Sequence, residues 1–500
     1  MSLFVLSRVL GLVRQMVVGA MFGTGDHLDA YMAAARVPEA IFLIVAGGAL
    51  GSALIPTFST HIARGDTRGA WRLASAIVNL VLAAMTILAL LIAIIAPTIV
   101  RTLIAPGFST AQQARTTDLL RVMLLSPIIF GASGVVMAVL NAQQHFFLPA
   151  LAPAIYNVGI IGGAVLLGPR MGVMGLAAGS IVGAVLHLLV QIPGLARYGA
   201  VYAPTFGLRE PSVRVVGRLM APRVIGTAIT QVNLMINNSL ASHMGEGAVS
   251  TINYAWLLMA LPEGVLAQAV GTAAFPTFAD QVARGQLDEM RETLAATLRT
   301  VFFLSLPATV GLLMLSRPLV GVLFERGAFQ ATSTTSVAWA LAFYALGLVG
   351  HAGLEVIARA FYALHDTFTP VWVGAVAVVT NVTLSLTLPG LFEIVGWPNF
   401  AGLALANAVA TLAEMGLLLV LIWRRMHGIE ARRLANTSAK SGVAALVMGL
   451  ALVLWQVALP EASSLVLAVG GTALGIAVYM GVALLLRAEE PLRLLDVLHR

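Results

Sequence analysis

The chain of 500 residues contains no cysteine, which excludes disulfide bonds, thiolate metal sites and cysteine nucleophiles. Charge is also scarce, because Asp, Glu, Lys and Arg make up 10% of the residues, whereas a soluble domain carries about 25%. Hydrophobic residues reach 59% of the chain, and its mean hydropathy is +0.93. These values exclude a soluble globule, a disordered chain and a coiled coil, and they predict an all-α polytopic membrane protein.

The sequence also lacks the motifs of the common enzyme classes. It contains no Walker loop, no H-E-x-x-H or G-x-S-x-G pattern, and no acid-rich loop for catalytic magnesium. The formal charge of +7 is thinly spread over 500 residues and does not indicate a nucleic-acid partner. We therefore predict that the protein is not an enzyme and has no metal site and no cofactor. Coupling to Na⁺ or H⁺ stays an alternative, because transport without an ATP site must use an existing gradient or potential.

Long apolar runs dominate the chain. A bilayer core of about 30 Å requires about 20 apolar residues in a helix. The second and eighth of the runs found here are longer than one crossing needs, and Pro38 and Pro262 are their expected breaking points. The fourteen predicted spans are 3–22, 27–58, 74–100, 118–141, 147–167, 172–193, 219–241, 250–279, 297–316, 334–361, 369–390, 400–423, 438–458 and 464–486.

The arginines predict the orientation of the chain in the membrane. If both termini are cytoplasmic, eighteen of the 29 Lys and Arg residues fall in the inner connections and five in the outer ones. Cytoplasmic loops carry an excess of Lys and Arg, so this distribution favours both termini inside. The N-terminal apolar run carries Arg8 and Arg14 within it and shows no convincing cleavage site, which argues against a signal peptide.

The chain repeats itself at an offset of 220 residues. Residues 55–66 and 275–286 share six identical positions, and Gly107 answers Gly327 at the same offset. Because the offset spans six predicted helices, both copies have the same orientation, as in transporters built from parallel repeats around a central cavity. The predicted segments are an N-terminal six-helix lobe over 1–200, a cytoplasmic linker over 201–218, a C-terminal six-helix lobe over 219–425, two additional helices over 437–486 and a cytoplasmic tail over 487–500.

Charged residues inside the spans of the first lobe are candidates for function, since each costs about 2.5–3.5 kcal/mol to insert into a membrane. Arg14 lies midway along the first span, and Arg8 lies nearer the cytoplasm on another face. Arg36 and Glu39 are three residues apart and can neutralise each other. Asp29 has two interpretations, a functional acid or a cap that interacts with the dipole of its own helix.

Three features of the second lobe also attract attention. Glu355 and Arg359 are spaced i, i+4 in the order that favours an internal ion pair. Glu263, in the eighth span, has no obvious partner. Asn237 belongs to a polar cluster in the seventh span, which indicates either hydrogen bonding between helices or contact with a substrate or cation.

Several of these residues carry a resemblance to a known family. Residues 7–14 read Ser-Arg-Val-Leu-Gly-Leu-Val-Arg, followed by Phe-Gly at 22–23 and Asp-Ala-Tyr at 29–31. Together with Tyr-Ala at 254–255 and Phe-Tyr-Ala at 361–363, this pattern resembles the MurJ/MviN family of lipid II flippases over nearly the whole chain. The resemblance implies the fourteen-helix fold of the multidrug/oligosaccharidyl-lipid/polysaccharide exporter (MOP) superfamily. It also implies transfer of undecaprenyl-linked peptidoglycan precursor from the inner to the outer leaflet.

The resemblance further implies residue roles. Arg8, Arg14 and Asp29 match the family's cavity arginines, which meet the pyrophosphate of the substrate, and its acidic residue. Some relatives use a sodium site in the second lobe, for which only Asn237 and Asn381 are suggestive here.

The chain departs from the family pattern where further cavity arginines are expected. Phe42, Leu43 and Leu257 occupy those positions, so half of the expected cationic cluster is missing. Glu355 and Arg359 are unusual against the same pattern. Three alternatives stay open: a shifted site, a different polyprenyl-linked cargo, or weakened activity.

The sequence therefore predicts a lipid II flippase of the bacterial plasma (inner) membrane, working as a monomer by alternating access for peptidoglycan synthesis, cell-wall biogenesis and cell shape. Its expected partners are the polyprenyl-diphosphate-linked glycan and membrane lipids. A flippase for another polyprenyl-linked glycan, a cation-coupled drug or metabolite antiporter of the same superfamily, and a membrane scaffold are the alternatives. The predicted substrate-binding residues are Arg8, Arg14, Asp29 and Arg36, and those assigned to coupling or gating are Glu39, Asn237, Glu263, Glu355, Arg359 and Asn381.

Overall fold

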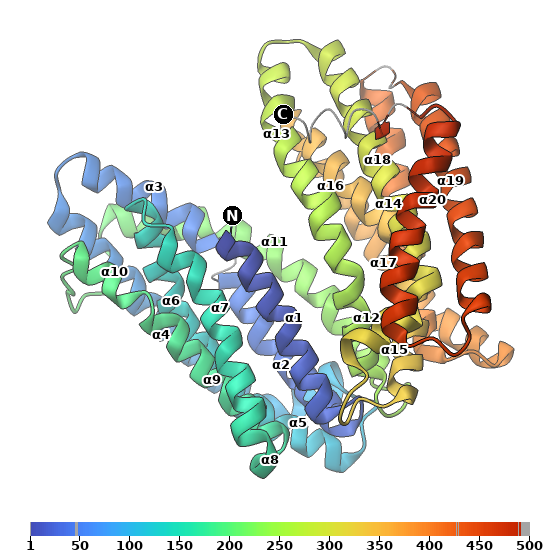
Figure 1. Cartoon of the computed structure of the whole chain (residues 1–500). Coiled ribbons are helices and arrows are strands. Elements are labelled where there is room, and N and C mark those ends of the chain that lie inside the picture. The colour runs from blue at the N-terminus through green and yellow to red at the C-terminus, as the bar shows by residue number, and fades with distance from the viewer. Residues whose placement is uncertain (1, 46–48, 427, 429, 489, 492–500) are drawn as a thin grey trace. The chain divides into compact units, whose positions relative to one another are not determined.

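A computed structural model describes residues 2–45, 49–426, 428, 430–488 and 490–491 (Figure 1). Within these ranges every regular element is a helix, as the composition predicted. The chain forms two compact units. The first comprises Met1–Ser250 with Arg326–Phe329, and the second comprises Thr251–Glu325 with Gln330–Arg500.

The first unit is a bundle of long helices in which α7 packs against both α1 and α9 (Figure 1). Four of its described elements are short: the helices α8 and α10 and the π-helical turns η1 and η2. Its helices are α1 (Ser2–Phe22), α2 (Asp26–Val45), α3 (Ala49–Ala63), α4 (Thr67–Ile99), η1 (Val100–Ile104), α5 (Thr110–Met123), α6 (Leu125–Ala142), α7 (Phe147–Gly162), η2 (Gly163–Leu167), α8 (Gly168–Met171), α9 (Val173–Leu189), α10 (Ile192–Arg197) and α11 (Pro211–Ala241).

The second unit is built around α14, α16 and α18, and α17 packs along α18. Helix α12 begins in the last residues of the first unit and continues into the second. The helices are α12 (Ala248–Glu263), η3 (Gly264–Gln268), α13 (Ala269–Ala283), α14 (Leu287–Phe324), α15 (Ala331–Leu346), α16 (Leu348–Ala363), α17 (Phe368–Val395), α18 (Asn399–Arg425), α19 (Ala431–Ala458), η4 (Val466–Gly470) and α20 (Gly471–Leu485).

Several predicted spans are interrupted helices. The second span contains α2 and α3, and the predicted break around 46–48 lies outside the described residues. The eighth span is α12 and α13 joined by the π-helical segment η3, and Pro262 lies one residue before the end of α12, next to this irregularity. The tenth is α15 and α16, bent by 43°. Within the described ranges ten helices are long and apolar enough to cross a membrane, or eleven with that bent pair. The count of fourteen therefore stays a prediction.

Glycine pairs allow two helices of the first unit to approach closely. An added Cβ at Gly159 would lie 2.3 Å from the Cα of Gly183, and one at Gly163 would lie 2.4 Å from the Cα of Gly179. These distances are far below a van der Waals contact, so α7 and α9 touch backbone to backbone. The Gly-x-x-x-Gly spacing therefore serves helix packing, as is common inside membranes.

Aromatic residues form the core of the second unit. Phe278, Phe302 and Phe361 are buried together where α13, α14 and α16 meet. A second cluster joins α14 to α19 and α20, and there the Tyr479 hydroxyl donates a hydrogen bond to the carbonyl of Phe303 at 2.6 Å. Helices α19 and α20 are thus held by α14.

The segment before α11 is tied to the first unit by polar contacts. The carboxylate of Glu210 lies 2.6 Å from the guanidinium of Arg72 on α4. The imidazole of His61 on α3 makes two hydrogen bonds. Its Nδ1 lies 2.8 Å from the carboxylate of Asp66, and its Nε2 lies 2.9 Å from the hydroxyl of Ser212. The pKa of Asp66 lies below its usual value because its carboxylate accepts hydrogen bonds from the Gly69 N–H and from His61.

These ties explain why α11 groups with the first unit, whereas the repeat assigns 219–241 to the second lobe. The two units group residues by their contacts, whereas the five segments predicted from the repeat divide the chain by its sequence. The five segments therefore stay a prediction.

Candidate functional site

Arg14 is the half-buried member of the two arginines predicted on α1. Its side chain is half-buried on α1, and within the described ranges no carboxylate pairs with it. The guanidinium acts electrostatically on the hydroxyls of Tyr31 and Tyr156. The Tyr31 hydroxyl lies 3.1 Å from that of Ser180 on α9. A guanidinium within electrostatic range of hydroxyl groups, with no acidic partner in the described residues, is suited to an anionic ligand.

The other predicted cations of the first unit differ from Arg14. Arg8 is exposed on α1. The guanidinium of Arg36 lies 3.6 Å from the carboxylate of Glu39, as their spacing predicted. Arg36 is therefore already neutralised within its own helix, and Arg14 is left as the half-buried cation without an acidic partner in the described residues.

Phe42 lies where the resemblance led us to expect an arginine, and it packs against another aromatic ring. Its ring lies 4.6 Å from that of Phe130. The Phe130 ring in turn contacts Tyr156 at 5.0 Å and His187 at 5.2 Å, both edge to face. Phe42 is thus part of an aromatic cluster that reaches one of the two tyrosines near Arg14, and its position is occupied by packing rather than by charge.

Asp29 lies in the first turn of α2, yet its carboxylate does not cap that helix. One carboxylate oxygen accepts a hydrogen bond from the Gly247 N–H at 2.8 Å, and the other accepts one from the Ser250 N–H at 2.7 Å. The residue is fully buried. Asp29 therefore caps the start of α12 from a neighbouring helix. The carboxylate hydrogen bonds thus go to the start of α12 rather than to α2, although Asp29 lies in the first turn of α2, and its contact with substrate stays a prediction.

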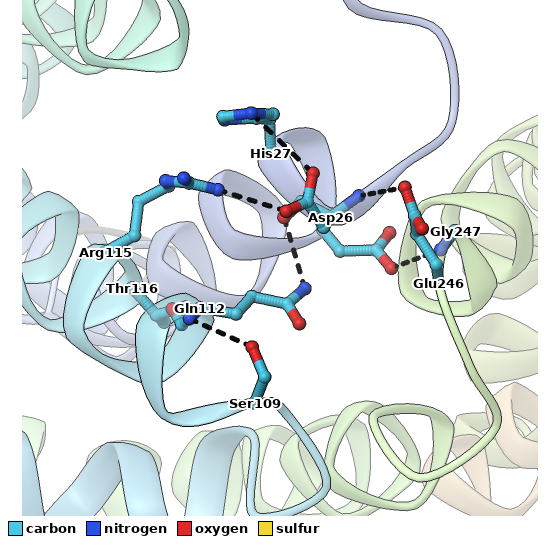
Figure 2. A network of polar contacts seen from close by, with 9 residues as sticks. Asp26, His27, Ser109, Gln112, Arg115, Thr116, Glu246 and Gly247 are labelled. Atoms are coloured by element: carbon cyan, nitrogen blue, oxygen red, sulfur yellow. Dashed lines mark hydrogen bonds and ion pairs between the residues drawn. The ribbon is translucent and has the colours of Figure 1, made fainter.

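A second polar network surrounds Asp26, at the beginning of α2 (Figure 2). Its carboxylate lies 3.2 Å from the guanidinium of Arg115, and its carbonyl accepts a hydrogen bond from Gln112 at 3.2 Å. Its N–H donates to the carboxylate of Glu246 at 3.4 Å. Figure 2 shows these groups converging from α5 and from the loop before α12 onto the start of α2.

Two glycines make reciprocal contacts next to these networks. An added Cβ at Gly107 would lie 2.6 Å from the carbonyl carbon of Ser242, and one at Gly327 would lie 2.2 Å from the carbonyl oxygen of Ala20. The glycines are related by the 220-residue offset, and the segments they contact end α11 and α1, which the same offset relates. The repeated sequence therefore builds two equivalent backbone contacts that only glycine fits.

The second unit contains a cavity of about 480 Å³ between α12, α13 and α16. Glu263, His351, Glu355 and Arg359 supply its titratable and charged lining. The guanidinium of Arg359 pairs with the carboxylate of Glu355, as their spacing predicted. Its Nη2 also lies 3.4 Å from the hydroxyl of Thr272.

The two asparagines suggested for a sodium site belong to different units. Asn381 is buried on α17, and neither atom of its amide has a hydrogen-bond partner in the described part of the chain. Asn237 is half-buried on α11 in the first unit. Among the described residues, no group of three His, Cys, Asp or Glu side chains could hold a metal ion. A joint role of the two asparagines stays a prediction.

Sequence reasoning missed Tyr156, Gln112 and Glu246. Tyr156 and Gln112 are far from α2 in the chain, and no local spacing relates them to it. A signal existed for Glu246, because it follows its partner Asp26 by 220 residues, the offset of the repeat.

The comparisons with known proteins agree over nearly the whole length. The family profile described as Lipid II flippase MurJ matches residues 18–469. A probable lipid II flippase MurJ from Rhizobium tropici is 32% identical, covering 95% of this chain and 90% of that protein. The lipid II flippase MurJ from Burkholderia cenocepacia is 33% identical, covering 85% and 82%.

Two solved structures share the fold. A lipid II flippase MurJ in an inward closed conformation aligns with a TM-score of 0.81 at 24% identity, covering 95% of this chain and 96% of that one. An inward-facing multidrug resistance transporter of the MATE family and MOP superfamily aligns with a TM-score of 0.69 at 15% identity, covering 84% and 94%. The profile and the relatives carry the family assignment, and the chain belongs to the lipid II flippase MurJ family.

Proposed function

We propose that the protein moves lipid II from the inner to the outer leaflet of the bacterial plasma membrane for peptidoglycan synthesis. It acts as a monomeric transporter rather than an enzyme, with both termini cytoplasmic. Membership of the family and its many apolar helices support a multi-pass protein of the inner membrane that handles a polyprenyl-linked glycan. The single observation that carries the proposal is Arg14, a half-buried guanidinium without an acidic partner in the described residues.

In the proposed mechanism Arg14 binds the diphosphate of the cargo. A diphosphate brings about two negative charges into a partly dehydrated site, where charge-assisted hydrogen bonds contribute about 1.5–3 kcal/mol each. Arg8, exposed on the same helix toward the cytoplasm, receives the headgroup first. Arg36 contributes less, because Glu39 already neutralises it.

The orientation gives a role to the contacts around Asp29. With the termini inside, the loops that contain residues 23–25, 105–109, 242–247 and 325–329 all lie on the outer side. The buried Asp29 carboxylate and the two glycine contacts then hold this side closed. Release of the headgroup outside requires these contacts to break, and alternating access follows from their making and breaking.

The test uses a strain depleted of its own lipid II flippase. We expect the wild-type chain to restore growth and to expose lipid II to an outer-leaflet enzyme in spheroplasts, and Arg14→Ala to fail in both. Arg14→Lys should retain part of the activity, because it keeps the charge but loses the bidentate geometry. Arg101→Ala, which removes an exposed arginine of η1, is the matched control.

Immunoblots of membranes establish equal expression of the variants. Growth with Arg14→Ala at the wild-type rate would remove Arg14 from the mechanism. Failure of the wild-type chain to expose lipid II, although it is present in the membrane, would refute the proposed cargo.

A further inference from the structure

A pocket of about 340 Å³ lies between the C-terminal end of α3 and the N-terminal end of α11, both of which belong to the first unit. One guanidinium, one imidazole and three hydroxyl groups form its polar lining, and none of the described lining residues is an acid. The lining therefore carries a positive charge. Its polar residues are Thr57, Thr60, His61, Arg64 and Ser212.

The internal repeat shows why Arg64 lacks an acidic partner. Arg64 and Arg284 are equivalent positions at the offset of 220 residues. In the second copy, the carboxylate of Asp280 contacts two nitrogens of the Arg284 guanidinium, each at 3.1 Å. The first copy has Thr60 in place of that acid, and the Thr60 hydroxyl donates to the carbonyl of Pro56 at 2.8 Å. Within the described ranges no carboxylate pairs with Arg64, so the two copies differ in whether their arginine is neutralised.

The acids closest to the pocket in the sequence are engaged by other groups. One carboxylate oxygen of Asp66 accepts a hydrogen bond from an N–H in the first turn of α4 at 2.9 Å, and the other lies 2.8 Å from Nδ1 of His61. Nε2 of His61 lies 2.9 Å from the hydroxyl of Ser212, which fixes the start of α11 against α3. Glu210 pairs with Arg72 of α4. Neither acid therefore neutralises Arg64, and their contacts hold the two walls of the pocket together.

The lining indicates the chemistry of a ligand. The planar guanidinium of Arg64 presents several N–H donors in a geometry that suits the oxygens of a phosphate group. The wall from α11 is apolar and accessible, because Val215 and Leu219 are 47% and 46% exposed. A soluble phosphate would use only the polar half of this lining, whereas a lipid phosphate brings an apolar chain for the other half.

The position of the pocket along the helices agrees with a lipid ligand. Helix α3 ends at Ala63, and Arg64 follows it directly. With the termini inside, this end of α3 lies at the cytoplasmic surface, where arginines at helix ends reach the headgroups of the inner leaflet.

We propose that the pocket formed by Arg64, His61 and Ser212 binds the phosphate group of an inner-leaflet lipid. The proposal rests on the proposed function only for the orientation of the chain, and it requires neither the cargo nor transport. An anionic phospholipid and the lipid-linked cargo both carry such a group. The single guanidinium matches the single negative charge of a phosphodiester more closely than the charge of a diphosphate.

The test measures binding directly on the full-length protein in a maltoside detergent, which contains no phosphate. Phosphatidylglycerol with a photoreactive acyl chain is titrated and cross-linked, and mass spectrometry maps the labelled peptides. We expect saturable labelling of residues 212–219. Arg64→Ala should raise the lipid concentration for half-saturation by about tenfold, the effect of losing one charge-assisted contact. Arg284→Ala is the matched control, because it removes the equivalent arginine that Asp280 already neutralises.

A second variant tests the missing acid without removing a cation. Thr60→Asp restores in the first copy the pairing that the second copy has, so it should weaken labelling about as much as Arg64→Ala. The side chains of Thr60 and Arg64 are both exposed, so neither change disturbs the core. Labelling of residues 212–219 as strong in Thr60→Asp as in the wild type would overturn the role assigned to the missing acid.

Competition identifies the source of the phosphate. Suppression of labelling by unlabelled phosphatidylglycerol, or at lower concentration by lipid II, supports a lipid site and names its occupant. Equal suppression by inorganic phosphate would overturn a lipid ligand. No labelling at residues 212–219, or half-saturation unchanged in Arg64→Ala, would overturn the site itself. None of these measurements involves transport, so such a failure leaves the proposed function intact, and a failure of the spheroplast assay leaves the pocket intact.

Discussion

Replacing Asp29 with asparagine should release the outer side of the protein. The wild-type carboxylate accepts one hydrogen bond on each oxygen, from Gly247 and Ser250, and is fully buried. Asparagine keeps one acceptor and turns a donor toward the other N–H. Because a hydrogen bond to a charged group contributes about 1.5–3 kcal/mol, Asp29→Asn should shift the equilibrium toward the outer-open state by about 2–3 kcal/mol. This shift corresponds to roughly thirty- to more than a hundredfold in population.

The absence of cysteine makes this shift measurable. Gly25 lies next to Glu246, since an added Cβ would be 3.3 Å from its carboxylate. A Gly25→Cys/Glu246→Cys protein should form a disulfide readily in membranes when the outer side is closed. Adding Asp29→Asn should slow this cross-linking by at least tenfold and should increase labelling of single cysteines in the same loops. Cross-linking as fast as in an Asp118→Asn control, whose acid is exposed on α5, would refute the closing role of Asp29.

Three further perturbations follow from the contacts. Gly327→Ala should open the outer side in the same cross-linking assay, because its Cβ would meet a carbonyl oxygen at 2.2 Å and its φ is +60°, whereas Gly311→Ala, with free space around it, should not. The pKa of Asp366 is lowered chiefly by the hydrogen bond from the Thr369 N–H at the start of α17. The ionised carboxylate therefore stabilises the fold above the ordinary carboxyl pKa of about 4, and this stabilisation is lost as the pH falls through the lower pKa of the folded state. Melting curves of Asp366→Asn should lack this loss on acidification. Phe42→Arg should lower the free energy of unfolding by about 3–5 kcal/mol, which is the sum of a lost aromatic contact and an inserted charge. Leu43→Arg should lower it by less, because the Leu43 side chain is already 40% exposed. Equal shifts of the melting temperature in the two variants would contradict the packing role of Phe42.

Local spacing predicted the short-range part of the site. The ion pairs Arg36–Glu39 and Glu355–Arg359 each lie within one helix, where positions three or four apart are neighbours, and both are present. Hydropathy likewise predicted where the helices lie, because apolar length is set by the bilayer. It did not predict π-helical turns such as η3, since a π-helical turn and an α-helical turn have the same apolar content.

The spacing of residues along one helix could not predict partners that are far apart in the sequence, with one exception. Asp29 could be assigned to its own helix or to a substrate, but nothing in α2 indicated that amides more than two hundred residues away would occupy it. The repeat held that information, because Asp26 and Glu246 are equivalent positions that meet. The offset of a parallel repeat can therefore predict a contact between equivalent positions as well as topology.

If Arg14 binds the diphosphate as proposed, the aromatic cluster around Phe42 bears on how a small number of arginines can hold it. An arginine at this position would have to be hydrated or paired, and Glu39, one turn earlier, is already engaged by Arg36. Phe42 instead packs on Phe130, and that ring contacts Tyr156 beside Arg14. Removing water from around Arg14 strengthens each of its interactions with an anion, since the effective dielectric falls. A smaller number of cations in drier surroundings can therefore hold a diphosphate about as firmly as a larger, wetter cluster, and release then depends on opening the outer contacts rather than on weak binding.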